Sequence, residues 1–91
     1  MGRIDILKTL NDIFNDVLDL DDIQLSELTS PNDLEEWDSL SHIQLVVAIE
    51  KEFKIKFKSS EIISWKNVGS IVNSIQEQLW NWLIVFGKEK T

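Results

Sequence analysis

The sequence predicts an all-α fold: a small four-helix bundle with a long first loop, a short third helix and an extended C-terminal helix. Apolar residues recur at intervals of three and four in residues 4–18, in residues 39–53 and from residue 68 onward, as in amphipathic helices. The stretch 19–37 is polar and irregular. A chain of 91 residues can bury one modest core, so we expect a single domain over 1–91.

The first helix and the loop after it are expected to share one core. The apolar stripe of the helix consists of Ile6, Leu10, Ile13, Phe14 and Val17. Loops as long as 19–37 are usually functional or packed by their own side chains. The loop residues expected to contact the core are Ile23, Leu25, Leu28 and Leu34. Within the loop, Ser30 followed by Pro31 predicts a capped short helical turn. The aspartates after the helix lack the glycine and glutamate of an EF-hand loop, so we expect no metal site.

The second half of the chain carries three more predicted helices. In 39–53 the core stripe is Leu45, Ile49 and Phe53, with Ile43 and Val46 beside it. An extended stretch follows over 54–58, and Ser59 is the expected N-cap of a short helix from Ser60 to about Trp65. Asn67 is expected to cap the last helix, which ends at Gly87. Its apolar stripe contains Val68, Ile71, Val72, Ile75, Leu79, Trp82, Leu83 and Phe86.

Composition excludes several classes of function. The net charge of −7 argues against nucleic acid as a partner, because phosphate binding requires a basic surface. The absence of cysteine excludes a disulfide framework and a thiolate nucleophile, and a single histidine leaves little for a zinc site or a catalytic triad. The first residues lack the apolar core of a signal peptide, and no apolar run reaches the roughly 18–20 residues that span a bilayer. We therefore expect a cytoplasmic protein.

Ser39 stands where the acidic loop becomes the second helix. A serine at an N-cap or in a first turn is exposed and close to unpaired backbone N–H groups. A phosphodiester on its oxygen would lie at the positive end of the helix dipole. We interpret Ser39 as a covalent attachment point; the alternative is that it only caps the helix.

A family resemblance supports this interpretation. The motif Asp38-Ser39-Leu40 is followed by apolar and acidic residues at fixed spacing and later by Val68-Gly69. The spaced residues are Ile43, Leu45, Ile49, Glu50, Phe53 and Ile55. This pattern resembles the acyl carrier proteins, and the similarity extends from the first helix to about Leu79.

The resemblance implies a non-catalytic carrier with 4′-phosphopantetheine on Ser39. A phosphopantetheinyl transferase would attach this arm from coenzyme A, and acyl groups would be carried as thioesters on its terminal thiol. The other partners implied are the enzymes that load and use the acyl group. The resemblance places partner recognition on Asp38, Leu40, Gln44, Val47, Lys51, Lys54 and Glu61.

Departures from the carriers of fatty acid synthesis predict a specialised pathway. Those carriers resemble Leu-Gly-x-Asp-Ser-Leu before the helix, where this chain has Glu36 and Trp37. They also have an acidic second helix, whereas this chain continues into Lys54, Lys56 and Lys58. The Trp-Asp-Ser-Leu form is similar to stand-alone carriers of polyketide-like, lipid or surface-polysaccharide pathways. The three lysines either select partners or simply form a solvated face.

Two other functions compete with acyl carriage. An aminoacyl or peptidyl carrier would share the fold, but such carriers usually have a glycine-rich approach to the serine, which is absent here. A small helical adaptor that is never modified would need no exposed serine at this helix start.

Trp37 is expected to pack on the long loop rather than to face a partner. His42 is expected to be a partly buried helix residue without catalytic chemistry.

Residues 79–91 form a hydrophobic C-terminal extension of the carrier domain. The run 79–86 contains one polar residue, Asn81, so a one-sided helix leaves Trp80, Ile84 and Val85 uncovered. Apolar surface of this kind usually marks an interface. The predicted roles are self-association, contact with a partner enzyme or a membrane surface, or a lid over the acyl chain. The alternative is a longer last helix that folds against the bundle.

Overall fold

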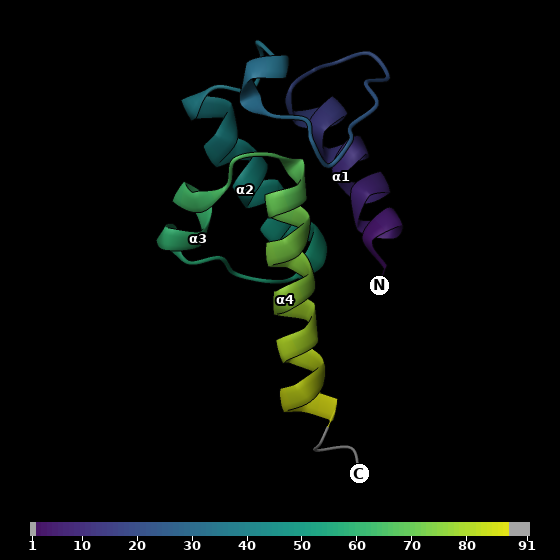
Figure 1. Cartoon of the computed structure of the whole chain (residues 1–91), viewed down its shortest axis with the longest axis vertical. Helices are drawn as coiled ribbons and strands as arrows, with labels where there is room; N and C mark the ends of the chain where they lie inside the picture. Colours follow the sequence, from purple (N-terminus) through teal and green to yellow (C-terminus); the bar gives the residue numbers. More distant parts are fainter. Residues whose placement is uncertain (1, 88–91) are drawn as a thin grey trace.

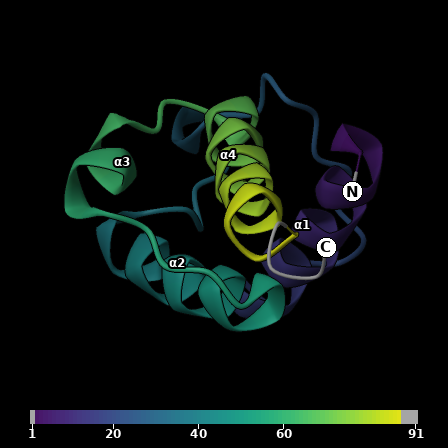
Figure 2. The same cartoon turned by 90° about the horizontal axis from the view of Figure 1, so that it is seen from below.

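The computed structural model describes the backbone of residues 2–87 and the side chains of residues 2–80. This part of the chain contains helices α1 (Arg3–Val17), η1 (Pro31–Asp33), α2 (Ser39–Phe53), α3 (Ser59–Ser64) and α4 (Val68–Gly87), and no strand. The expected all-α bundle is confirmed. Its α1 packs against both α2 and α4, and α3 lies beside the beginnings of α2 and α4 (Figures 1 and 2).

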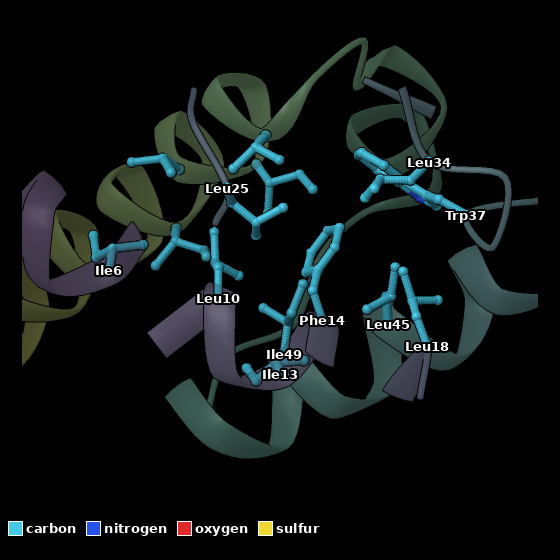
Figure 3. Packing of buried hydrophobic residues seen from close by; sticks show 14 residues of the cluster. Ile6, Leu10, Ile13, Phe14, Leu18, Leu25, Leu34, Trp37, Leu45 and Ile49 are labelled. Carbon is cyan, nitrogen blue, oxygen red and sulfur yellow. The ribbon is translucent and has the colours of Figure 1, made fainter. Parts of the chain in front are cut away.

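The core is built from one face of each long helix and from the loop between α1 and α2. Figure 3 shows Phe14 near the centre of this cluster, with side chains from several elements pointing toward it. The buried apolar residues are Ile6, Leu10, Ile13, Phe14, Leu18, Leu25, Leu34, Trp37, Leu45, Val46, Ile49, Val68, Ile71, Val72 and Ile75. The described part of each predicted stripe is therefore buried or packed against the cluster.

The long loop is tied to α1 by two asparagines. The Asn15 side chain accepts from the backbone N–H of Ile23 (2.8 Å) and donates to its carbonyl (3.2 Å). The side-chain Oδ1 of Asn11 accepts from the backbone N–H of Leu25 (2.7 Å). Leu25 and Leu34 are buried and Ile23 packs against the core, as expected. The predicted turn at Pro31 is also confirmed, with Ser30 as its N-cap.

The prediction that Leu28 contacts the core is wrong, because this side chain is 82% exposed. The backbone on both sides of it turns inward instead. The carbonyl of Glu27 accepts from Gly69 N–H (2.7 Å), and that of Thr29 accepts from Val68 N–H (2.8 Å). These two bonds satisfy backbone donors at the start of α4, and the residue between the two carbonyls faces solvent.

Two further helix predictions need correction. Ile43 is 63% exposed, because the buried face of α2 follows Leu45, Val46 and Ile49. The third helix begins at Ser59 itself, and Lys58 occupies the N-cap position. There Glu61 Oε1 accepts from the backbone N–H of Lys58 (3.2 Å), so the cap is set by Glu61 and not by a serine.

The last helix begins as predicted, and Asn67 Oδ1 accepts from the backbone N–H of Ser70 (2.9 Å). The helix continues to Gly87 and extends past the ends of the other helices (Figure 1). Trp80 is 62% exposed, while Ile84 and Val85 lie outside the residues whose side chains are described. None of the helices in the described range is long and apolar enough to cross a membrane.

Candidate functional site

Ser39 is the first residue of α2, and its neighbours perform the capping. Asp38 is the N-cap, and its Oδ1 accepts from the backbone N–H groups of Leu40 (3.1 Å) and Ser41 (2.9 Å). In return Ser41 Oγ accepts from the backbone N–H of Asp38 (2.8 Å). The hydroxyl of Ser39 takes no part in this cap and has no hydrogen-bond partner among the described residues. It is exposed and free to carry a substituent.

The cap also determines the charge at this helix start. The backbone N–H and hydroxyl of Ser41, followed by the N–H of Leu40, hold the pKa of the Asp38 carboxyl below its ordinary value. Asp38 is therefore ionised at neutral pH, which suits the positive end of the helix dipole. The helix start thus has a fixed anion beside the exposed hydroxyl.

Trp37 anchors the chain just before the cap. Its side chain is 4% exposed and meets Phe14 of α1 edge to face, with ring centroids 5.0 Å apart. This confirms that Trp37 packs within the fold rather than facing a partner. Because the residue two positions before Ser39 is fixed in the core, the start of α2 is held in a defined place on the surface.

An open groove of about 440 Å³ lies beside Ser39, between the start of α2 and α3. Its walls are mostly aromatic and aliphatic. The lining residues are Pro31, Trp37, Asp38, Ser39, His42, Ile62, Ile63 and Trp65. An exposed hydroxyl next to an apolar groove fits a long flexible substituent that begins with a phosphodiester. The groove provides room for that substituent along the protein surface.

Four predicted recognition residues share one face of α2, and a fifth follows at its end. Leu40, Gln44, Val47 and Lys51 follow one another at helical spacing, Lys54 is the C-cap, and all five are exposed. Leu40 is 70% exposed and Val47 47%. Ile43, which was expected at the core, adds a third apolar side chain next to this face. Ile43 lies three residues after Leu40 and four residues before Val47, which is the spacing of one helix face. This spacing is the signal in the sequence that could have identified Ile43 as exposed.

Two predicted residues lie off this face. Asp38 caps α2, as described above. Glu61 lies on α3, half-buried, where its carboxylate accepts from Lys58 N–H and lies 3.5 Å from Gln78 Nε2. The structure therefore does not bring Glu61 into the exposed stripe of α2.

The comparisons with known proteins agree with this geometry. Residues 8–75 match the family model described as the phosphopantetheine attachment site. The solution structure of the holo acyl carrier protein from Geobacter metallireducens is 43% identical and superposes with a TM-score of 0.79. The match covers 85% of this chain and 88% of that chain. The chain belongs to the acyl carrier protein family. The curated proteins contain no match.

Membership of the acyl carrier protein family explains why the site needs neither a catalytic residue nor a sulfur of its own. The chain is a non-catalytic carrier, and its cofactor is covalently attached 4′-phosphopantetheine. The thiol at the end of that arm is a sulfur that the chain itself, which has no cysteine, does not supply. Acyl carrier proteins work with a phosphopantetheinyl transferase and with acyl-handling enzymes.

Proposed function

We propose that Ser39 receives the 4′-phosphopantetheine arm and that acyl groups are carried as thioesters on the arm's terminal thiol. The observation that carries this proposal is the hydroxyl of Ser39, which is exposed and unbonded while Asp38 and Ser41 complete the cap. The alternative is that Ser39 only caps the helix. In that case its hydroxyl would accept a backbone N–H of the first turn, but the N–H of Ser41 is bonded to Asp38 instead.

The loading step is a substitution at phosphorus. Ser39 Oγ forms a bond to the phosphorus that bears pantetheine in coenzyme A, and the bond from that phosphorus to the nucleotide phosphate breaks. The nucleotide leaves as adenosine 3′,5′-bisphosphate, and the hydroxyl proton passes to a base of the transferase. The carrier supplies the nucleophile and its placement, and the transferase supplies the catalysis.

Mass spectrometry after incubation with coenzyme A and a promiscuous transferase tests the attachment. We expect the wild-type chain to gain one phosphopantetheine and Ser39→Ala to gain none. Ser41→Ala is the matched control, because it removes a hydroxyl two residues away that belongs to the cap. An unmodified wild-type chain, or modification that persists in Ser39→Ala, contradicts the proposal.

We further propose that this carrier serves a specialised acyl pathway, polyketide-like or for lipid or surface polysaccharide, in the cytoplasm where coenzyme A is available. Lys51, Lys54, Lys56 and Lys58 are all exposed around the end of α2. Charge complementarity selects partners and speeds their encounter. A basic end on the recognition helix fits poorly to enzymes that present a basic patch to acidic carriers.

Partner assays test the specialised role. A fatty-acid ketosynthase should extend the acyl form of this chain more slowly than that of an acidic housekeeping carrier. Replacing Lys54, Lys56 and Lys58 by glutamate should raise that rate. Equal rates for the two carriers would refute the specialised role, and an unchanged rate after charge reversal would show that the lysines do not select partners.

We also propose that the domain over 1–91 associates with a second copy of itself or with a membrane surface through its extension, 79–91. The exposure of Trp80 supports this proposal, as does the projection of α4 beyond the bundle (Figure 1). Truncation after Gln78 should abolish either self-association, measured by light scattering, or binding to liposomes. If truncation changes neither property, the extension mediates neither self-association nor membrane contact.

A further inference from the structure

His42 lies between two tryptophans at the groove beside Ser39. The Trp37 and His42 rings are nearly parallel, with 18° between their planes and 6.1 Å between centroids. Trp65 meets His42 edge to face at 5.8 Å and also packs on Phe57 at 4.8 Å. The Trp65 indole is itself held by a bond from Nε1 to Ser74 Oγ of α4 (2.8 Å). The imidazole is therefore enclosed by rings whose positions are fixed by other elements.

The hydrogen bond between Trp37 and His42 determines which imidazole nitrogen carries the proton. Trp37 Nε1 can only donate, and it lies 3.0 Å from His42 Nδ1. Nδ1 must therefore be the acceptor, which places the proton of the neutral ring on Nε2. Because Nδ1 and Nε2 point in roughly opposite directions, Nε2–H points away from the buried side chain of Trp37.

The Nε2–H group has no acceptor among the described residues, although its ring lines the groove with Ser39. A polar donor that is fixed in orientation and left without a partner is suited to a ligand that brings an acceptor. His42 follows Ser39 by three residues, so their side chains are neighbours on α2, with Cβ atoms about 5–6 Å apart. The first group beyond Ser39 Oγ in the attached arm is an anionic phosphodiester.

We propose that His42 is a positioning residue for the arm, donating its Nε2–H to the phosphodiester on Ser39. The inference rests on the proposed attachment at Ser39. Trp37 determines the tautomer, and Trp65 with Ile62 and Ile63 forms the apolar wall along which the pantetheine chain lies. The arm of this carrier then has a defined resting place on the protein surface between visits to enzymes.

The test compares apo and holo protein by nuclear magnetic resonance at one fixed pH, after mass spectrometry has shown that the arm is attached. Long-range ¹H–¹⁵N spectra should show the Nε2–H tautomer in the apo form. On attachment of the arm, the Nε2 resonance of His42 should shift and Nδ1 should stay the acceptor. An Nε2 resonance identical in the two forms overturns the proposal. Failure of attachment would instead overturn the proposed function, so the two failures are distinguishable.

Two variants separate hydrogen bonding from ring packing. His42→Phe keeps a ring between Trp37 and Trp65 but removes the donor. His42→Gln retains an N–H donor near the position of Nε2. The ³¹P resonance of the holo phosphodiester should move away from its wild-type position in the Phe variant and return toward it in the Gln variant. A Gln variant that follows the Phe variant, or a ³¹P resonance unchanged in both, contradicts the role of His42 as donor. The wild-type comparison needs no variant, so misfolding of either one leaves the proposal testable.

Discussion

The carboxylate of Asp38 accepts two backbone N–H groups in the first turn of α2, from Leu40 and Ser41. This bonding leaves the adjacent Ser39 outside the cap. Asp38→Ala should therefore lower the melting temperature, because it leaves those N–H groups without their acceptor. Asp38→Asn should lose less, since asparagine keeps an acceptor for those N–H groups and lacks only the charge. Thermal unfolding followed by circular dichroism checks both variants, and equal melting of the two would show that the charge, not the cap, is important.

The same carboxyl makes a pH-dependent contribution to stability. Its pKa in the folded protein lies below the ordinary value of 3.8, because the charged form is hydrogen-bonded to Ser41 and Leu40. The contribution is fully present above the unfolded-state pKa and is lost as the pH falls through the lower folded-state pKa. Asp38→Asn should make the free energy of unfolding depend less on pH as the pH falls through these two pKa values. A curve of unchanged slope, measured by urea unfolding between neutral and acidic pH, would contradict this expectation.

At the scale of an element, α2 ends in an unfavourable backbone conformation. Its C-cap, Lys54, has φ 57° and ψ 47°, the left-handed region that a residue with a Cβ adopts only at a cost. Lys54→Gly should raise the free energy of unfolding by about 1 kcal/mol, because glycine adopts this conformation without the clash of a Cβ. Lys54→Ala is the matched control, because it removes the charge and keeps the Cβ. Denaturant unfolding that gives the two variants equal stability would show that the backbone conformation contributes nothing.

The junction of α4 with the long loop depends on a residue without a side chain. A Cβ on Gly69 would lie 2.9 Å from the carbonyl oxygen of Glu27, the atom that accepts from Gly69 N–H. Gly69→Ala should lower stability by about 1–3 kcal/mol, because the loop must move away from α4. Gly2→Ala is the control, since its nearest contact would be 3.9 Å. Equal melting temperatures for these two variants would exclude a close approach at Gly69.

At the scale of the whole molecule, Trp37 connects the loop to α1 through Phe14 and to α2 through His42, which in turn meets Trp65. Trp37→Ala should cost about 3–5 kcal/mol, a large part of the stability of a small domain. Trp80→Ala is the control, because Trp80 is mostly exposed and its removal should change unfolding little. Comparable losses in the two variants, measured by denaturant titration, would show that Trp37 is not a central packing residue.

Periodicity and capping signals in the sequence predicted the helices, because both are local properties. The bounds expected for the second helix, 39–53, are those observed, and the first helix differs by one residue at each end. The position of Ser39 at the helix start follows from the same local signals and from the resemblance to acyl carrier proteins. The departures at Trp37 and in the lysine segment are equally visible in the sequence.

The tertiary structure decided which apolar residues are covered and which polar groups meet. Leu28 faces solvent because the carbonyls beside it bond to α4, and Ile43 is exposed because the neighbouring elements cover a different face of α2. The aromatic cluster brings together residues 37, 42 and 65 from three segments, and it fixes the His42 ring beside Ser39. Local sequence determines where a helix forms and which residues share a face. Only the packing of distant segments determines whether an individual apolar residue such as Leu28 or Ile43 is covered, because its burial depends on neighbours that the local pattern does not encode.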